Sequence, residues 1–151
     1  MASDVHFNLS HSERVALVAV TRYGELGVDV EQVRDRRYMA KIVERFFAPA
    51  EQQHWLALAP DQRRAGFFNC WTRKEAYIKA LGTGLRQGVF WRDMGVINLP
   101  SGKPTMQLTN GALARLEKIT PDGMQAQIDL TITDDFPLAQ AIVIISAVPK
   151  S

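Results

Sequence analysis

The chain has 151 residues, 46% hydrophobic and 23% charged, a composition typical of one soluble globular domain with a single core. Its 18 Lys and Arg side chains nearly balance 16 Asp and Glu, and a formal charge of +2 does not indicate a nucleic-acid partner. No apolar run is long enough to span a membrane. We therefore expect one domain over 1–151, with neither nucleic acid nor membrane as partner.

The cysteine content and the N-terminal segment bear on location. Cys70 is the single cysteine, so no intramolecular disulfide can form, and a reducing compartment is favoured. A small, buried apolar role is the simplest interpretation of its side chain. The segment MASDVHF lacks the basic and apolar regions of a signal peptide. We expect a cytoplasmic protein.

The predicted elements divide the chain into three stretches. Over about 5–31, the apolar and β-branched segments VHFNLS, RVALVAVT and LGVDVE predict short strands joined by turns. Helices follow: 35–47 has amphipathic spacing, a second helix opens at Pro49, and a third runs from about Pro60 to Gly82. Strands return in GVFWRDMGVINL, AQIDLTIT and QAIVIISAV. This order predicts an α+β fold, with an antiparallel sheet packed against helices.

Two acidic residues share one face of a predicted strand. Asp29 and Glu31 in GVDVE are two residues apart, so Val28 and Val30 point to the opposite, buried face. Because a strand rises about 3.3 Å per residue, both carboxylates can reach one cation. A solvated strand face would carry the same pair.

A third acid and a base lie on the third predicted helix. Glu75 and Lys79 are one turn apart in WTRKEAYIKALGTGL, residues 71–85. Glu75 would complete a set of three oxygen ligands suited to Mg²⁺, and Lys79 could offset charge on a phosphate. Mn²⁺ accepts the same ligands. The alternative is an exposed Glu–Lys helix pair worth about 0.3–0.5 kcal/mol.

The segment FNLSHS, residues 7–12, is predicted to end a strand in a Ser-His-Ser turn. Its hydroxyl, imidazole and backbone N–H groups could receive an anion such as phosphate. No GxSxG elbow accompanies His11, so a hydrolase triad is not predicted. The other histidines lack metal-ligand spacing, which argues against zinc.

Taken in order, FNLSHS, GVDVE and WTRKEAYIKALGTGL resemble the three signature motifs of the 4′-phosphopantetheinyl transferases. The resemblance is to the larger type, which activates peptide and polyketide synthases such as surfactin synthetase, and it covers about residues 6–85. It implies a phosphopantetheinyl transferase-like half-domain. It also implies transfer of the 4′-phosphopantetheine arm of coenzyme A to a serine of an apo acyl or peptidyl carrier protein, releasing 3′,5′-ADP.

The resemblance implies a metal and a general base in the site. Asp29, Glu31 and Glu75 would bind Mg²⁺ against the pyrophosphate of coenzyme A. Glu75 would also act as general base toward the incoming serine, directly or through water.

Four residues would contact coenzyme A on the same resemblance. Ser10 and His11 would bind a phosphate of its nucleotide end, and Lys79 would bind or protonate the departing phosphate. Lys74 is a secondary candidate for a phosphate contact.

Carrier proteins of this class are generally acidic, so a basic surface would dock them. Arg34, Arg36 and Arg37, with apolar residues near Phe46 and Phe47, are candidates for it. A solvated basic helix start, with both phenylalanines in the core, explains the same residues.

Members of the larger type contain two similar halves, and most of the first half is missing before FNLSHS. Because the family's coenzyme A site lies between the halves, the resemblance implies self-association or a separate partner subunit. The smaller holo-acyl-carrier-protein synthases form trimers with sites between subunits. A non-catalytic coenzyme A or carrier-protein binding module and another Mg²⁺-dependent phosphotransferase are the alternative functions.

Overall fold

The computed structural model describes residues 5–82, 84, 88–133 and 137–150. The strands in these ranges are β1 (His6–Ser12), β2 (Val15–Thr21), β3 (Glu25–Gln32), β4 (Met94–Asn98), β5 (Pro104–Leu108), β6 (Met124–Thr133) and β7 (Leu138–Pro149). The α-helices are α1 (Met39–Phe46), α2 (Pro49–Ala57), α3 (Arg63–Leu81) and α4 (Asn110–Ile119). Short 3₁₀ helices form at Pro60–Gln62 and Trp91–Asp93. None of these described helices is long and apolar enough to cross a membrane.

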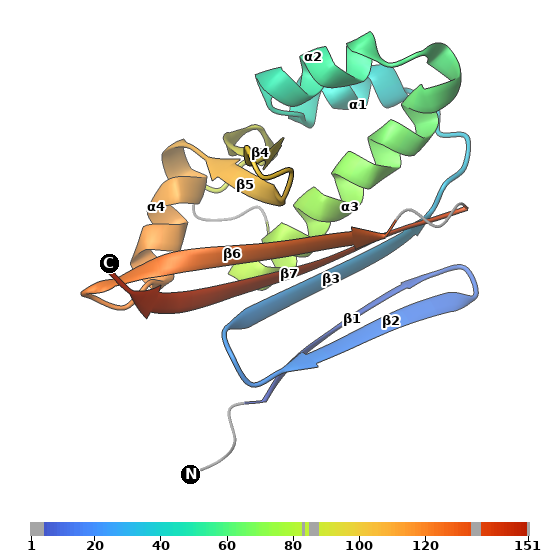
Figure 1. The fold of residues 1–151 in the computed structure, drawn as a ribbon. Coiled ribbons are helices and arrows are strands. Elements are labelled where there is room, and N and C mark those ends of the chain that lie inside the picture. Colours follow the sequence, from blue (N-terminus) through green and yellow to red (C-terminus); the bar gives the residue numbers. More distant parts are fainter. Residues whose placement is uncertain (1–4, 83, 85–87, 134–136, 151) are drawn as a thin grey trace.

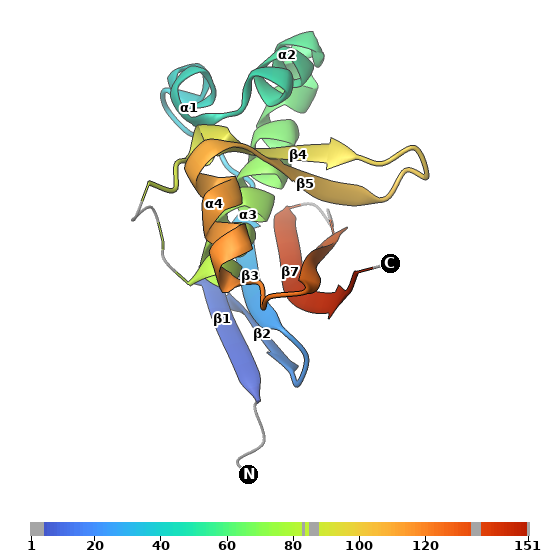
Figure 2. The same cartoon turned by 90° about the vertical axis from the view of Figure 1, so that its left-hand side faces the viewer.

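A three-stranded antiparallel sheet in the order β3-β7-β6 forms the base of the fold. Helix α3 packs against β3 and β7, and the other helices lie on the same side of the sheet (Figure 1). The β4–β5 hairpin lies on that side too and projects past α3 (Figure 2). The β1–β2 hairpin flanks β3. The predicted α+β class with antiparallel sheets is confirmed.

The contact between α3 and β3 is unusually close at Gly27. A Cβ atom built on Gly27 would lie 1.8 Å from the Ala76 carbonyl oxygen and 2.6 Å from the Ala80 backbone nitrogen. Such distances leave no room for any side chain, so glycine is required here. Ala76 and Ala80 present small side chains to the sheet and are buried. Together these residues bring the helix against the strand that carries Asp29 and Glu31.

The β1–β2 hairpin is joined to β3 by hydrogen bonds from the β3 backbone to β1 side chains. Three polar side chains of β1 accept hydrogen bonds of 2.9–3.1 Å from backbone N–H groups of β3: Asn8 from Val28, Ser10 from Val30 and Ser12 from Gln32. Side chains two residues apart share one face of a strand, which explains the spacing. These bonds satisfy the outer edge of β3, which would otherwise offer unpaired donors.

Several element boundaries differ from expectation. The first helix begins at Met39 rather than near residue 35, because Tyr38 adopts a left-handed conformation with φ +64°. The segment 88–99 is a strand only from Met94, after the 3₁₀ turn. Helix α4 was not predicted at all. Its buried residues, Ala112 and Leu116, are four apart, as a helix requires, but two apolar positions are too few to predict a helix.

The Gly27 contact predicts that adding one methyl group at this position strongly destabilises the fold. We expect Gly27→Ala to lower the free energy of unfolding by about 1–3 kcal/mol or more, because the methyl group meets backbone rather than a movable side chain. Urea denaturation measures this. Gly95→Ala is the matched control, since its Cβ would lie 3.4 Å from the Ala48 Cβ and 3.8 Å from the Gln107 carbonyl oxygen, both ordinary or nearly ordinary contacts. Equal losses in the two variants would contradict the assigned role of Gly27.

Candidate active site

Asp29 and Lys79 meet where β3 faces α3. Lys79 Nζ lies 3.5 Å from Asp29 Oδ1 and donates a 2.8 Å hydrogen bond to the Val28 carbonyl oxygen. Ser10 Oγ donates to the same Asp29 oxygen at 3.1 Å. The other oxygen, Asp29 Oδ2, is buried and has no hydrogen-bond partner. The Lys79 ammonium therefore pairs with Asp29 on β3. The alternative drawn from the sequence was an ion pair with Glu75, one turn away on the same helix.

Asp29, Glu31 and Glu75 form one electrostatic group. Burial raises the pKa of each carboxyl above its ordinary value. For Glu75 the pKa reaches about 7, because the Asp29 and Glu31 charges add to the cost of burial and outweigh the opposing effect of Lys79. A carboxyl with this pKa is half ionised near neutral pH, as a general base requires.

This group fits a divalent cation in its chemistry. It offers hard carboxylate oxygens, and Asp29 Oδ2 is buried without a partner. A cation would also offset the cost of burying the three carboxylates and the repulsion that adds to it at Glu31 and Glu75. Within the described residues, however, no three acidic, cysteine or histidine side chains are already assembled as a metal site. Metal binding by Asp29, Glu31 and Glu75 stays a prediction.

Ser10 and His11 do not form the phosphate-binding turn that was predicted. Both lie within β1, and the chain turns only after Ser12, with Glu13 at φ +52°. Because side chains alternate along a strand, Ser10 is buried toward Asp29 and His11 is exposed on the opposite face. The two side chains of one copy therefore point to opposite faces of the hairpin, and their contact with a phosphate stays a prediction. Ser10 instead orients Asp29.

Lys74 is also placed differently from its predicted role in phosphate binding. Its side chain is fully buried and its Nζ lies 2.6 Å from Glu51 Oε1, with a further bond to the Met94 carbonyl. Adjacent helical residues are about 100° apart, so Lys74 cannot share the face of Glu75. The ammonium is committed to Glu51, which also accepts bonds from the Ala48 and Val96 N–H groups and from Cys70 Sγ.

Arg36 extends from the loop after β3 toward the acidic group. Its guanidinium lies 4.8 Å from the Trp71 ring centroid, and its charge partly opposes the rise in the pKa of Glu31 and of Glu75. The expected docking surface is otherwise changed, because Phe47 is buried against Phe67 and cannot contact a carrier. Arg34 pairs with Glu13 at 3.5 Å on the surface.

Comparison with known proteins identifies the family. Residues 25–140 match the model of the 4′-phosphopantetheinyl transferase superfamily. The chain belongs to this superfamily. It is 54% identical over 127 residues to a holo-acyl-carrier-protein synthase of Afipia carboxidovorans, covering 82% of this chain and 93% of that protein. A Bradyrhizobium diazoefficiens holo-acyl-carrier-protein synthase is 51% identical over 135 residues, covering 88% of this chain and 91% of that protein.

Solved structures have the same superfamily fold. A holo-acyl-carrier-protein synthase from Neisseria meningitidis matches with a TM-score of 0.70 at 21% identity, over 82% of this chain and 98% of that one. The Thermotoga maritima enzyme matches with a TM-score of 0.60 at 25% identity, over 82% and 64%.

These relatives do not support the predicted larger type. Both curated relatives are of the smaller synthase type, and this chain covers more than nine tenths of each. These relatives therefore give no support to the expectation that the first half of a larger, two-half transferase is missing. The superfamily match begins at residue 25, after the β1–β2 hairpin that contains FNLSHS. The motif that favoured the larger type thus lies outside the matched residues.

Two side-chain contacts that hold β3 in this transferase were missed from the sequence. Asn8 and Ser12 share the alternating pattern of Ser10, and that polar period of two was the available signal. Arg36 was a predicted docking residue, but its contact with Trp71 was not predicted, because no periodicity indicates what a loop side chain will contact. Thr83 and Leu85 of the third motif lie outside the described residues.

The raised pKa of Glu75 predicts a pH-dependent stability. The folded state keeps the Glu75 proton up to about pH 7, whereas an unfolded glutamate loses it near its ordinary value of 4.5. Stability therefore falls as pH rises from 4.5 through 7, since the unfolded state binds fewer protons there. We expect Glu75→Gln to raise the Tm by a few degrees at pH 8 without divalent cations, and by much less at pH 5.

Differential scanning fluorimetry at the two pH values measures this difference. Glu44→Gln, at an exposed position on α1, is the control and should leave the Tm unchanged at both. A Tm gain for Glu75→Gln that is equal at pH 5 and pH 8 would show that the gain does not come from this ionisation.

Proposed function

We propose that this chain transfers the 4′-phosphopantetheine arm of coenzyme A to a serine hydroxyl of an apo acyl carrier protein, in a Mg²⁺-dependent reaction that releases 3′,5′-ADP. The observation that carries the proposal is Glu75, a carboxyl with a pKa of about 7, facing Asp29 and Lys79 within the superfamily match. The names of the curated relatives support the same reaction.

Glu75 and Lys79 divide the chemistry. Glu75 accepts the proton of the carrier's serine hydroxyl. As it does so, the serine oxygen attacks the phosphorus that bears the pantetheine arm. The new Ser O–P bond replaces the P–O bond of the pyrophosphate, and 3′,5′-ADP leaves. Lys79, which is partly exposed, stabilises the negative charge that develops on the departing phosphate.

Asp29, Glu31 and Glu75 are the residues that would hold Mg²⁺. The ion, when bound, supplies charge neutralisation at the pyrophosphate. Ser10 holds Asp29 in place through one oxygen and leaves Asp29 Oδ2 for the ion. A carboxylate has two oxygens, so Glu75 can serve both as a ligand and as the base.

Carrier recognition is assigned to the basic loop after β3. Arg36, exposed and near the acidic group, is placed to meet an acidic carrier beside its serine. Arg34 and Arg37 are exposed in the same loop and extend the positive surface. A cytoplasmic location and a single domain over 1–151 stay predictions.

A carrier-modification assay tests the function. Apo acyl carrier protein incubated with the chain, coenzyme A and Mg²⁺ should gain the mass of the arm. We expect Glu75→Ala to slow the reaction by about 10²–10⁴-fold, a loss typical of a missing general base. Mass spectrometry of the carrier follows the reaction, and Glu44→Ala is the surface control.

Two results of this assay would contradict the proposal. Binding of coenzyme A without modification of the carrier would indicate a non-catalytic binding module. Full activity of Glu75→Ala would remove Glu75 from the mechanism.

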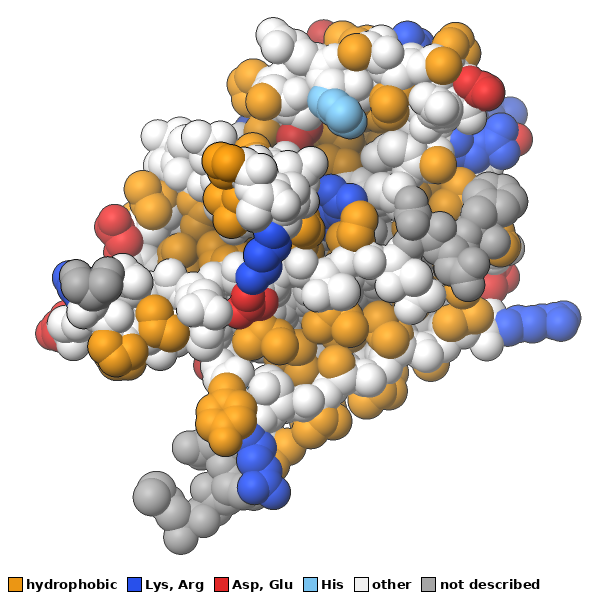
Figure 3. All heavy atoms as spheres, in the orientation of Figure 1, with side chains coloured by type: hydrophobic (Ala, Val, Ile, Leu, Met, Phe, Trp, Pro, Cys, Tyr) orange, Lys and Arg blue, Asp and Glu red, His pale blue; other side chains and the backbone are white. Residues whose placement is uncertain are grey.

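The outer face of the β1–β2 hairpin supports self-association. Phe7 and Val20 are direct cross-strand partners with 73% and 63% of their surface exposed, and Leu9 and Val18 form the next such pair. Hydrophobic side chains follow the lower edge of the molecule over this hairpin (Figure 3). Contiguous apolar surface of this kind marks an interaction site.

We infer that a second copy of this chain covers that face. His11 projects from the same side as Leu9, away from the Asp29 of its own chain. A neighbouring copy would bring His11 toward a second site, where a phosphate contact becomes possible. Symmetric association of identical chains is the commonest form of protein assembly.

Sedimentation velocity tests this assembly. We expect the wild-type chain to sediment as an oligomer and the double variant Phe7→Ser/Val20→Ser to sediment as a monomer with an unchanged circular dichroism spectrum. Leu56→Ser is the control, because Leu56 is an equally exposed apolar residue on α2. A wild-type monomer that transfers the arm would overturn the inference.

A further inference from the structure

Helix α3 carries two aromatic rings on the same stripe as the acid and the base of the candidate site. Phe67, Trp71, Glu75 and Lys79 follow one another at intervals of four residues, and residues four apart on a helix are neighbours on its surface. Arg36 lies over the aromatic end of this stripe, with its guanidinium carbon 4.8 Å from the Trp71 ring centroid and 5.7 Å from that of Phe67. The guanidinium is therefore seated on the ring that is one helical turn from Glu75.

The Trp71 ring is fixed by its aromatic neighbours. Its centroid lies 4.2 Å from that of Trp91, with 57° between the ring planes, and 5.7 Å from that of Phe67, with 22° between the planes. Phe67 and Trp91 are buried, whereas Trp71 is only partly buried. The indole therefore has a defined orientation and still presents surface to the loop that carries Arg36.

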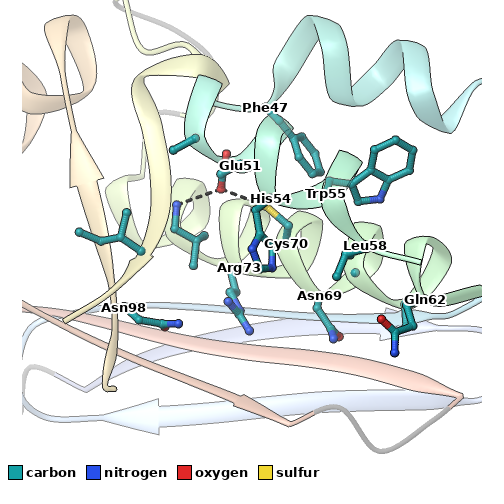
Figure 4. A pocket seen from close by; sticks show the side chains of 15 residues that line it. Phe47, Glu51, His54, Trp55, Leu58, Gln62, Asn69, Cys70, Arg73 and Asn98 are labelled. Carbon is teal, nitrogen blue, oxygen red and sulfur yellow. Dashed lines mark hydrogen bonds between the residues drawn. The ribbon is translucent and has the colours of Figure 1, made fainter. Parts of the chain in front are cut away.

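Contacts on another side of α3 hold the helix in this rotation. Glu51 of α2 accepts hydrogen bonds of 2.9 Å from Cys70 Sγ and from the Val96 N–H group, which join α3, α2 and β4 (Figure 4). Cys70 and Trp71 are adjacent in sequence and project about 100° apart around the helix. The bonds to Glu51 thus help to set the direction in which the Trp71 ring points.

The loop after β3 is tied down on both sides of Arg36. Arg64 Nη2 lies 3.0 Å from Asp35 Oδ1, and the Val33 N–H group donates to the Pro137 carbonyl at 2.7 Å. The ion pairs formed among the described residues do not include Arg36. Because an aromatic face takes none of the in-plane hydrogen bonds of a guanidinium, these N–H groups stay available to a carboxylate.

We propose that Trp71 is a positioning residue for carrier recognition: its indole holds the Arg36 guanidinium beside the acidic group, where the carrier's serine must arrive. This inference rests on the proposed function, in which Arg36 meets an acidic carrier. Without the indole, Arg36 keeps its charge but loses its fixed place. The carrier then binds more weakly, and the transfer step of the bound carrier is unchanged.

A double-mutant cycle on carrier affinity tests this role. Fluorescence anisotropy of labelled apo acyl carrier protein, without coenzyme A, measures binding in the absence of turnover. We expect Trp71→Leu to weaken binding about 2- to 5-fold, the size of a cation–π contact at an exposed site. In the Arg36→Met background the same change should have no effect, because no guanidinium is left to position. Trp71→Phe retains a ring face and should keep most of the affinity.

Steady-state rates and a control variant accompany the cycle. Trp71→Leu should raise the KM for the carrier by a similar factor and leave kcat unchanged, since the ring acts through Arg36 and not on the reacting groups. Lys118→Met removes the same charge from an exposed position on α4 and should bind the carrier as the wild type does. Equal losses of affinity from Trp71→Leu in both backgrounds, or a fall in kcat alone, would overturn the proposal.

NMR spectroscopy of the arginine side chains reports the ring contact without any carrier. The Arg36 Nε–H signal, assigned by its loss in Arg36→Met, should be shifted upfield by the indole ring current, and Trp71→Leu should remove that shift. An Arg36 signal that does not respond to Trp71→Leu would contradict the proposal. Coupled carrier binding without transfer of the arm would overturn the proposed transferase function and would still support the role of Trp71.

Discussion

The close approach of α3 to β3 at Gly27 sets the position of every charged group in the candidate site. Asp29 follows Gly27 by two residues and therefore faces the same helix, while Lys79 lies one turn beyond the Glu75 position on α3. A side chain at residue 27 would push the helix away from the strand. Two features depend on that short distance: the 3.5 Å contact between Lys79 and Asp29, and the burial and acidic neighbours that together raise the pKa of Glu75.

The opposite face of α3 is fixed by a buried ion pair rather than by close backbone contact. Lys74 and Glu51 join α3 to α2, and their further bonds to Met94 and Val96 join both helices to β4. Removing one partner of such a pair leaves an unpaired buried charge, so the two residues also fix the rotation of the helix. Adjacent residues of one helix thus have separate tasks: Lys74 anchors α3, and Glu75 faces the reaction.

Periodicity explains which parts of the site were predictable. Asp29 and Glu31 alternate with buried valines, and Glu75 and Lys79 are one turn apart, so local spacing and the resemblance to a known family sufficed to group them. Ser10 and His11 were misplaced because the strand continues through Ser12, which sends neighbouring side chains to opposite faces. Lys74 was misassigned because its partner, Glu51, is 23 residues away, and no local pattern indicates a buried long-range ion pair. Helix α4 has few buried positions, so its apolar spacing was too weak a signal to be recognised between the strand-like segments on either side.

Strand β1 of the β1–β2 hairpin is polar on its inner side and carries Phe7 and Leu9 on its outer side. On β1 the inner side chains Asn8, Ser10 and Ser12 substitute for backbone acceptors along β3, a role that serine and asparagine can fill and valine cannot. Apart from His11, the outer side chains of the hairpin are apolar although they face solvent. An isolated chain gains nothing from that arrangement, since exposed apolar area is not removed from water. The proposed contact with a second copy would remove this apolar area from water, and it would bring His11 into the same contact.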